Sequence, residues 1–352
     1  MEAPTIALLG SKVIDQIAAG EVVERPASVV KELLENAVDA GASRIHVDSA
    51  QGGRGLIRVV DDGHGMTPEQ LSISIQRHAT SKLRCVEDLD TISTMGFRGE
   101  ALPSIASVSR LTLTSRAGRR ASGARLHIEG GKVGEVEPAA CAPGTTIEVA
   151  DLFFNTPARL KFLKSTATEA AHIADMVNHA ALGAPGVHFS LKVEGRRGMD
   201  LPPCAHRLER CKAALGRYGG ELRAASLTRD GWEAEAVLAP PSQTLRTARH
   251  LSLVVNGRQV RDRALLQAVL SGYGHLLDRG RYPVGVIYLD LPPGSLDVNV
   301  HPQKTEVRFA EPRRVFSLSR RCVEELLAAS PWLGGSDPDR PVPAPARRYS
   351  LP

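Results

Sequence analysis

Residues 31–42 read KELLENAVDAGA and predict a helix that is buried on one side. Its apolar residues recur at three- and four-residue spacing, which is typical of the buried face of a helix; they are Val30, Leu33, Leu34, Ala37 and Val38. Gly41 follows the last of them and suits the left-handed position at which many helices end.

Three polar residues of this helix share one side. Glu32, Asn36 and Asp39 lie four and seven residues apart, so their side chains project in similar directions. A carboxylate beside a carboxamide suits the attack of water on a phosphate, because the acid can take a proton and the amide oxygen can bind Mg2+. An ordinary solvated helix face is the alternative, since such residues are usually exposed.

A second segment, DDGHGM at 61–66, follows the β-rich run LIRVV at 56–60. It places Asp61 at a strand end, where the carboxylate can accept a hydrogen bond from the exocyclic amine of a base. Gly63 and Gly65 leave room for a planar ring against the backbone. The next residues predict a helix start with an N-cap, an N1 proline and a capping-box partner; they are Thr67, Pro68 and Gln70.

A third segment, GFRGEAL at 96–102, places two glycines and an arginine before a helix with Pro103 in its first turn. Backbone amides at such a helix start can bind a phosphate. RHATSKL at 77–83 is small and polar, which predicts a mobile lid. A glycine-rich loop with no ligand is the alternative for each segment taken alone.

These segments and GTTIEV at 144–149 resemble the ATPase family shared by type II topoisomerases, heat-shock chaperones and histidine kinases. Within it, five further strings are similar to the N-terminal ATPase region of the MutL family of DNA mismatch repair. They are QIAAGEVVERPASVV at 16–30, GFRGEAL at 96–102, DLFFNTPAR at 151–159, VNGRQVRDR at 255–263 and DVNVHPQKTEVRF at 297–309. The similarity runs from about residue 12 to residue 330.

The resemblance implies a role for each residue that matches a family motif. Glu32 would be the general base, Asn36 the Mg2+ ligand and Asp61 the residue that binds adenine. Further residues would line ATP, mostly through their backbone: Gly65, Thr80, Arg98, Gly99, Glu100, Ala101, Leu102 and Thr146. Lys304 would approach the γ-phosphate from a second domain. Glu35 is a rival base on composition, although it lies about 60° around the helix from Glu32.

The expected fold class is α+β. A Bergerat-type ATPase sandwich, with a mostly antiparallel sheet and helices on one face, would be followed by a smaller α/β domain of ribosomal-protein-like fold. The predicted segments are an N-terminal arm at 1–15, an ATP-binding domain at 16–200, a transducer and DNA-binding domain at 204–330, and the start of a flexible linker at 331–352. Strands are expected at 111–114, 125–129, 145–149, 187–193, 251–255 and 284–290, and helices near 166–181, 204–216, 262–274 and 312–328.

Charge is unevenly distributed. Residues 1–100 have 10 Lys and Arg against 15 Asp and Glu, which leaves 34 against 24 in residues 101–352. Arginines at 246, 249, 258, 261, 263, 279 and 281 suggest a groove for a phosphate backbone. Net charge alone does not separate this interpretation from a generally Arg-rich surface. The resemblance favours sequence-independent binding of duplex and single-stranded DNA, with Arg263 and then Arg261 as the candidates.

Composition sets further bounds. No run approaches the roughly 18 apolar residues of a membrane span, and five scattered cysteines favour reduced thiols over a disulfide framework. We therefore expect a cytosolic protein without a membrane partner, and the resemblance implies a bacterial protein associated with the nucleoid.

The function implied by the resemblance is coordination of mismatch repair. The chain would bind and slowly hydrolyse Mg-ATP, dimerise on ATP binding to clamp DNA, and pass the signal of a MutS-type mismatch recogniser to a nuclease, helicase or sliding clamp. A non-hydrolysing, ATP-gated clamp stays open as an alternative, as does another ATPase of the wider family with a different output. We see no nuclease motif in the sequence, and neither a DNA-cleaving tyrosine with an acidic metal cluster nor a phospho-acceptor histidine.

Overall fold

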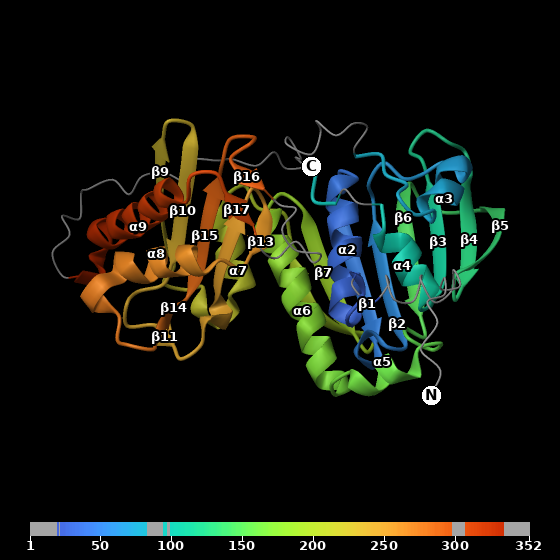
Figure 1. Cartoon of the computed structure of the whole chain (residues 1–352), viewed down its shortest axis with the longest axis horizontal. Helices are drawn as coiled ribbons and strands as arrows, with labels where there is room; N and C mark the ends of the chain where they lie inside the picture. The colour runs from blue at the N-terminus through green and yellow to red at the C-terminus, as the bar shows by residue number, and fades with distance from the viewer. Residues whose placement is uncertain (1–19, 21, 83–93, 97–98, 298–306, 334–352) are drawn as a thin grey trace, which may run out of the picture. The chain divides into compact units, whose positions relative to one another are not determined.

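The computed structural model describes residues 20, 22–82, 94–96, 99–297 and 307–333 (Figure 1). These residues form two compact units, each of which is described by itself. The first unit holds the described residues of 1–83, 96–176 and 190–199, and the second holds those of 84–95, 177–189 and 200–352.

The first unit is built around an eight-stranded sheet with the order β5-β4-β3-β6-β2-β1-β7-β8. The five pairings from β5 to β1 are all antiparallel. The strands are β1 (Arg44–Ala50), β2 (Leu56–Asp61), β3 (Arg110–Arg116), β4 (Gly123–Glu129), β5 (Lys132–Ala139), β6 (Gly144–Ala150), β7 (His188–Val193) and β8 (Arg196–Leu201).

Alternation along the strands shows which face of this sheet is covered. In β1, β2, β3 and β6 every second side chain is buried and those between are only partly covered, the pattern of a sheet with one packed face. The helices are α2 (Pro26–Asp39), α3 (Pro68–Ser74), α4 (Ala101–Ser107), α5 (Pro157–Phe162) and α6 (Thr166–Gly183). Figure 1 shows α2 and α4 on the same side of the sheet.

The helix predicted from the opening stretch is confirmed. α2 buries its apolar face, including Leu33, Leu34 and Ala37, and Gly41 lies just beyond its end with a φ of 70°. The start of α3 is confirmed as well, because Thr67 and Gln70 form both hydrogen bonds of the capping box.

The second unit contains a five-stranded sheet with the order β13-β12-β15-β10-β9. The β12–β15 pair is parallel, and the other described pairs are antiparallel. The strands are β9 (Arg223–Arg229), β10 (Trp232–Leu238), β12 (Leu251–Val255), β13 (Arg258–Val260) and β15 (Gly285–Asp290). Short strands form two further pairs, β11 (Thr244–Leu245) with β14 (Tyr282–Pro283) and β16 (Leu296–Asp297) with β17 (Arg308–Phe309).

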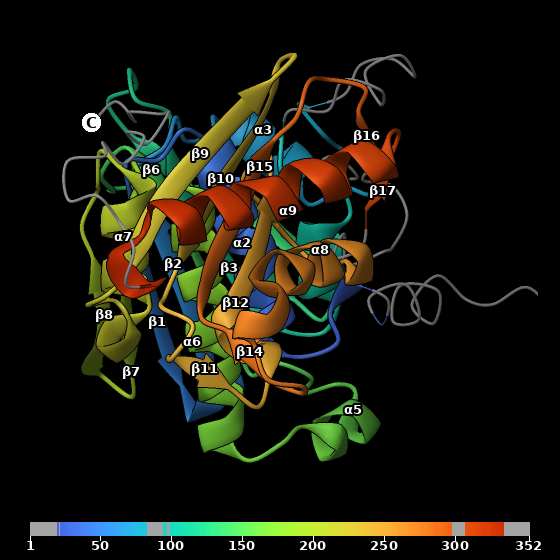
Figure 2. The same ribbon diagram turned by 90° about the vertical axis from the view of Figure 1, so that its left-hand side faces the viewer.

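The helices of this unit are α7 (Arg207–Ala214), α8 (Arg263–Tyr273) and α9 (Pro312–Ala329). α8 and α9 pack against each other beside the sheet (Figure 2). α9 buries Val315, Leu318 and Cys322 on the side that faces β9 and β10.

The predicted α+β class is confirmed, and the structure adds strands that the sequence did not predict. Residues 196–201, for which no element was predicted, form strand β8. β5 was missed because it is an exposed edge strand without alternation. The β9–β10 hairpin was missed although Asp230 and Gly231 form a typical tight turn between the strands. In the described part of the chain, we find no helix whose length and apolarity would let it cross a membrane.

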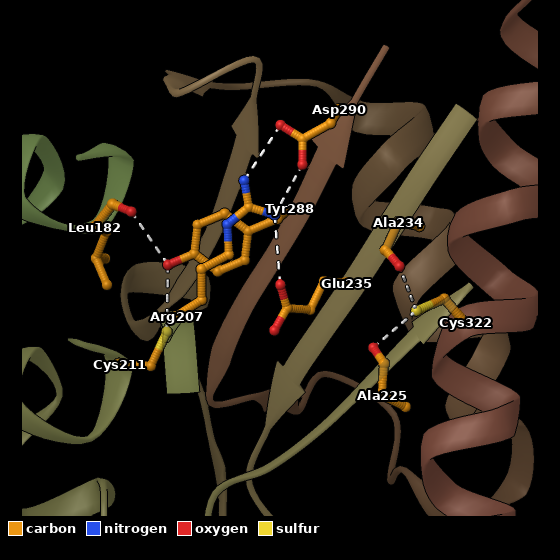
Figure 3. Close-up of polar contacts among 9 residues, drawn as sticks. All are labelled: Leu182, Arg207, Cys211, Ala225, Ala234, Glu235, Tyr288, Asp290 and Cys322. Atoms are coloured by element: carbon orange, nitrogen blue, oxygen red, sulfur yellow. Dashed lines mark hydrogen bonds and ion pairs between the residues drawn. The ribbon is translucent and has the colours of Figure 1, made fainter. Parts of the chain in front are cut away.

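A buried ionic network lies on one face of the sheet of the second unit (Figure 3). The Arg207 guanidinium makes two hydrogen bonds to Asp290, at 2.8 and 3.2 Å, and a third to Glu235 at 3.4 Å. It also stacks over the Tyr288 ring at 4.3 Å. The Tyr288 hydroxyl donates to the carbonyl oxygen of Leu182. Burial raises the pKa of Glu235, although the Arg207 charge opposes that shift.

Arg207→Met should lower the free energy of unfolding by about 3–5 kcal/mol, because two buried carboxylates would lose their shared cation. Arg314→Met is the matched control. Arg314 also pairs with an aspartate, Asp230, and stacks on an aromatic ring, Trp232, but it is partly exposed, so its loss should cost about 1 kcal/mol or less. Urea denaturation measures both, and equal losses would contradict the assigned role of burial.

Candidate functional site

Helix α2 presents the candidate base and the candidate metal ligand from one side. Lys31 lies beside both acidic residues of the first turns, with its ammonium 3.0 Å from Glu35 and 3.6 Å from Glu32. Both carboxylates are largely covered, with side chains 15% exposed for Glu32 and 14% for Glu35. The structure therefore keeps Glu32 in a partly desolvated position but does not by itself separate it from Glu35.

Further along α2, Asn36 and Asp39 converge on one cation. The Lys82 ammonium lies 2.9 Å from the Asn36 amide oxygen and 2.5 Å from Asp39 Oδ2. The backbone N–H of Gly96 donates to the same Asp39 oxygen at 2.9 Å. From the sequence, Lys82 was expected only to be part of a lid, because its partners lie more than 40 positions away.

Asp61 ends strand β2 on the buried face of the sheet. Burial raises the pKa of its carboxyl from 3.8 to about 6, although hydrogen bonds from the backbone of Gly63 and Thr145 lower it. The carboxylate is thus held ready to accept a hydrogen bond, in a position that disfavours its charge.

The neighbouring Asp62 has a different task. Its carboxylate accepts hydrogen bonds from the backbone N–H groups of Ser43 and Arg44, both at 2.7 Å, and from the side chains of the same residues. Burial raises the pKa of Asp62, but these bonds outweigh it and leave that pKa below its usual value. Asp62 therefore fastens the turn to the start of β1.

The turn after β2 is packed tightly at Gly65. This residue has a φ of 66°, and a side chain there would collide with the carbonyl group of Arg116 at the end of β3. Met66 N–H donates to Ser115 Oγ at 2.8 Å. The second glycine of the motif is thus required by the approach of the turn to β3.

The pairing of β2 with β6 determines which threonine of the GTT string lies on the same face of the sheet as Asp61. Thr145, and not Thr146, is paired with Asp61 on β2. Thr145 is buried like Ile147 and Val149, whereas Thr146 alternates to the other face. Thr145 was not predicted, although the alternation of this strand could have identified it. The role of Thr146 stays a prediction.

The glycine-rich segment 99–102 packs against residues 78–80. His78 N–H donates to the carbonyl oxygen of Gly99 at 3.1 Å, and Thr80 Oγ1 accepts from Lys82 N–H. Glu100 is the N-cap of α4 without a side-chain capping bond. Ala101 and Leu102 form the first turn of α4 and are partly exposed. Arg98 and Lys304 lie outside the described residues, so their roles stay predictions.

In the second unit, Arg261 and Arg263 are exposed on either side of Asp262. Asp262 is the N-cap of α8 and accepts from Leu265 N–H at 2.7 Å. Two cations beside a helix N-terminus add to the positive potential of the helix dipole. Two other arginines of the predicted groove make hydrogen bonds within the protein. Arg258 is buried and donates to the carbonyl oxygen of Thr94, and Arg281 donates to Thr244.

Comparison with known families matches two parts of the chain. Residues 24–142 match the family described as histidine kinase-, DNA gyrase B-, and HSP90-like ATPase. Residues 218–328 match the family described as DNA mismatch repair protein, C-terminal domain.

Curated relatives and solved structures agree with these matches. The chain is 48% identical to the DNA mismatch repair protein MutL of Pelobacter propionicus over 93% of this chain and 54% of the relative. It is 48% identical to MutL of Anaeromyxobacter dehalogenans over 97% of this chain and 56% of the relative. The chain thus spans about half the length of the curated relatives it matches.

Among solved structures, the MutL ATPase domain of Aquifex aeolicus complexed with ADP has a TM-score of 0.63 and 26% identity. This match covers 86% of this chain and 98% of that one. The N-terminal domain of a DNA repair protein has a TM-score of 0.75 over 89% of this chain and 97% of that one; at 21% identity, it supports the fold alone.

The shifted pKa of Asp61 predicts how stability depends on pH. Because the folded-state pKa of about 6 lies above the ordinary value of 3.8, the ionised carboxylate costs stability at neutral pH, and that cost disappears as the pH falls below 3.8. Asp61→Asn should therefore raise the free energy of unfolding at pH 8 by up to ~3 kcal/mol, with a gain that shrinks towards pH 4.

Asp62→Asn is the matched control and should act in the opposite direction. Its lowered folded-state pKa means that the charge stabilises the fold at neutral pH and that this contribution is lost on acidification. Denaturant titrations at pH 8 and pH 4 compare the two variants. A pH-independent effect of Asp61→Asn would contradict the assignment.

Proposed function

The chain belongs to the MutL family of DNA mismatch repair proteins, and on that basis we propose that it hydrolyses ATP with Mg2+ as a nucleotide-gated coordinator of mismatch repair. The observation that carries the proposal is the site on α2 and β2. One helix supplies acid and amide oxygens, and the adjoining strand ends in a buried aspartate.

The donor set on α2 fits a hard cation. The Asn36 and Asp39 oxygens both lie within 3 Å of one ammonium nitrogen, so they converge on a position suited to positive charge. Oxygen ligands are the type that Mg2+ prefers, and one protein ligand suffices when phosphates and water complete its coordination. Asn36 would hold the ion, which when bound neutralises phosphate charge.

Glu32 would take the proton from the attacking water. Its place two turns before Asp39, on the same side of α2, suits this role. Asp61 would accept a hydrogen bond from the exocyclic amine of adenine, with Thr145 beside it. The backbone of Gly65, Thr80, Gly99, Glu100, Ala101 and Leu102 would line the nucleotide.

Glu32→Ala should reduce ATP turnover on the order of 10²- to 10⁴-fold and leave nucleotide affinity nearly unchanged, because the base acts on water. Steady-state phosphate release and calorimetric nucleotide titration measure the two effects. Glu35→Ala is the matched control, since Glu35 shares the partner Lys31, and it should retain turnover. Wild-type turnover in Glu32→Ala would remove this residue as the base.

For the second unit, we propose sequence-independent contact with the phosphate backbone of duplex and single-stranded DNA. Arg261 and Arg263 support it, because they are exposed beside the N-terminus of α8. Phosphate contacts of this kind make affinity strongly dependent on salt.

Arg263→Glu should weaken DNA binding, lower DNA stimulation of ATP turnover and leave basal turnover near wild type. Fluorescence anisotropy with a labelled duplex at several salt concentrations measures it. Arg281→Glu makes a poor comparison, because Arg281 binds Thr244; Arg229→Glu on the hairpin β9 is the better charge-matched control. A salt-independent affinity would count against backbone contact.

Family membership also supports an ATP-dependent association of two copies that closes around DNA, with a MutS-type mismatch recogniser and a nuclease, helicase or sliding clamp as partners. Loss of the γ-phosphate on hydrolysis would reopen the clamp.

The protein should be monomeric without nucleotide or with ADP and dimeric with a non-hydrolysable ATP analogue. Multi-angle light scattering measures the mass in each state. Deletion of residues 1–15, the predicted arm, should abolish the dimer. One mass in all nucleotide states would leave an ATPase without the clamp.

A further inference from the structure

Lys82, the lysine of RHATSKL at 77–83, has no part in the roles proposed so far. Lys82 extends its ammonium to the side of α2 that carries the candidate metal ligand, where it binds Asn36 Oδ1 and Asp39 Oδ2. The contact is largely covered, since the Lys82 side chain is 18% exposed and that of Asp39 is 6% exposed.

The room for this contact is provided by Gly96, the first residue of GFRGEAL. A Cβ atom at that position would lie 2.9 Å from Lys82 Nζ, 3.4 Å from Asn36 Oδ1 and 3.6 Å from Asp39 Oδ2. Gly96 thus borders all three groups, and it also donates its N–H to Asp39. The lysine and the helix meet here because this residue has no side chain.

The Lys82 ammonium would repel a bound metal ion, because both would contact the same Asn36 oxygen. A metal held by Asn36 Oδ1 would share that oxygen with the Lys82 ammonium, which lies 2.9 Å from it. The ammonium and the metal ion are both positive, so at this short range they repel each other strongly in a partly desolvated site. Lysine suits a reversible arrangement, because its charge is compact and its stem is flexible.

We propose that Lys82 acts as a tethered cation that competes with the divalent metal for the Asn36 amide oxygen, so that metal loading requires Lys82 to leave Asn36. This inference rests on the proposed Mg-nucleotide site and adds a positioning residue to it. Lys82 keeps Asn36 and Asp39 oriented while it is bound, and it makes the site select for a metal that arrives with nucleotide phosphates.

The test measures how binding of fluorescent ADP to the whole chain depends on Mg2+. The Mg2+ concentration that gives half-maximal binding is compared between wild type and three variants. Lys82→Met should lower that concentration on the order of tenfold, since one competing charge is removed. Gly96→Ala should shift it in the same direction by less, because the new methyl group displaces the ammonium without removing its charge. Lys132→Met, which removes an exposed lysine from edge strand β5, should leave it unchanged.

A second measurement uses Mn2+ alone, without nucleotide, followed by electron paramagnetic resonance. Lys82→Met should bind Mn2+ more tightly than wild type, and circular dichroism should show that both variants are folded. Tight ADP binding with an unchanged or higher Mg2+ requirement in Lys82→Met would overturn the competition and leave the ATPase proposal intact. If Lys82→Met binds Mn2+ more tightly than wild type but the chain binds no ADP, the competition between Lys82 and the metal would be supported. The proposed nucleotide site would then be overturned.

Discussion

The site depends on how closely the turn after β2 is held between the end of α2 and the end of β3. His64 N–H donates to the carbonyl oxygen of Ala40, just beyond α2, at 3.0 Å. Met66 N–H donates to Ser115 Oγ on β3 at 2.8 Å. These bonds, and the lack of room for a side chain at Gly65, fix Asp61 relative to the helix that carries Asn36.

Two adjacent carboxylates in that turn have opposite effects on stability at neutral pH. Asp62 accepts four hydrogen bonds from Ser43 and Arg44, which outweigh its burial and stabilise the fold. Asp61 is more deeply buried and receives fewer, so its ionised form is disfavoured. Sites for ligands often contain such locally unfavourable groups, and the packing around them supplies the compensation.

Local signals predicted α2 and the capping box of α3, because each depends on neighbours within about one helical turn. Strands β5 and β8 were missed because an edge strand is defined by its partner and not by its own periodicity. Thr145 was missed although the alternation of β6 puts it on the buried face with Ile147 and Val149. Lys82 was missed because its contacts lie more than 40 positions away, which the sequence of one segment does not specify.

The Arg207 and Lys82 ion pairs differ in burial and geometry, and this difference explains why only the Lys82 pair is proposed to exchange its cation. Arg207 is 3% exposed, with Glu235 at 1% and Asp290 at 12%, and its planar group is bound at both ends and stacked on Tyr288. Its removal would leave buried charge with no replacement. Lys82 is 18% exposed and makes point contacts, so another cation can substitute for it. A buried arginine with fork geometry thus suits a permanent structural network, whereas a lysine at the edge of a site suits an exchangeable one.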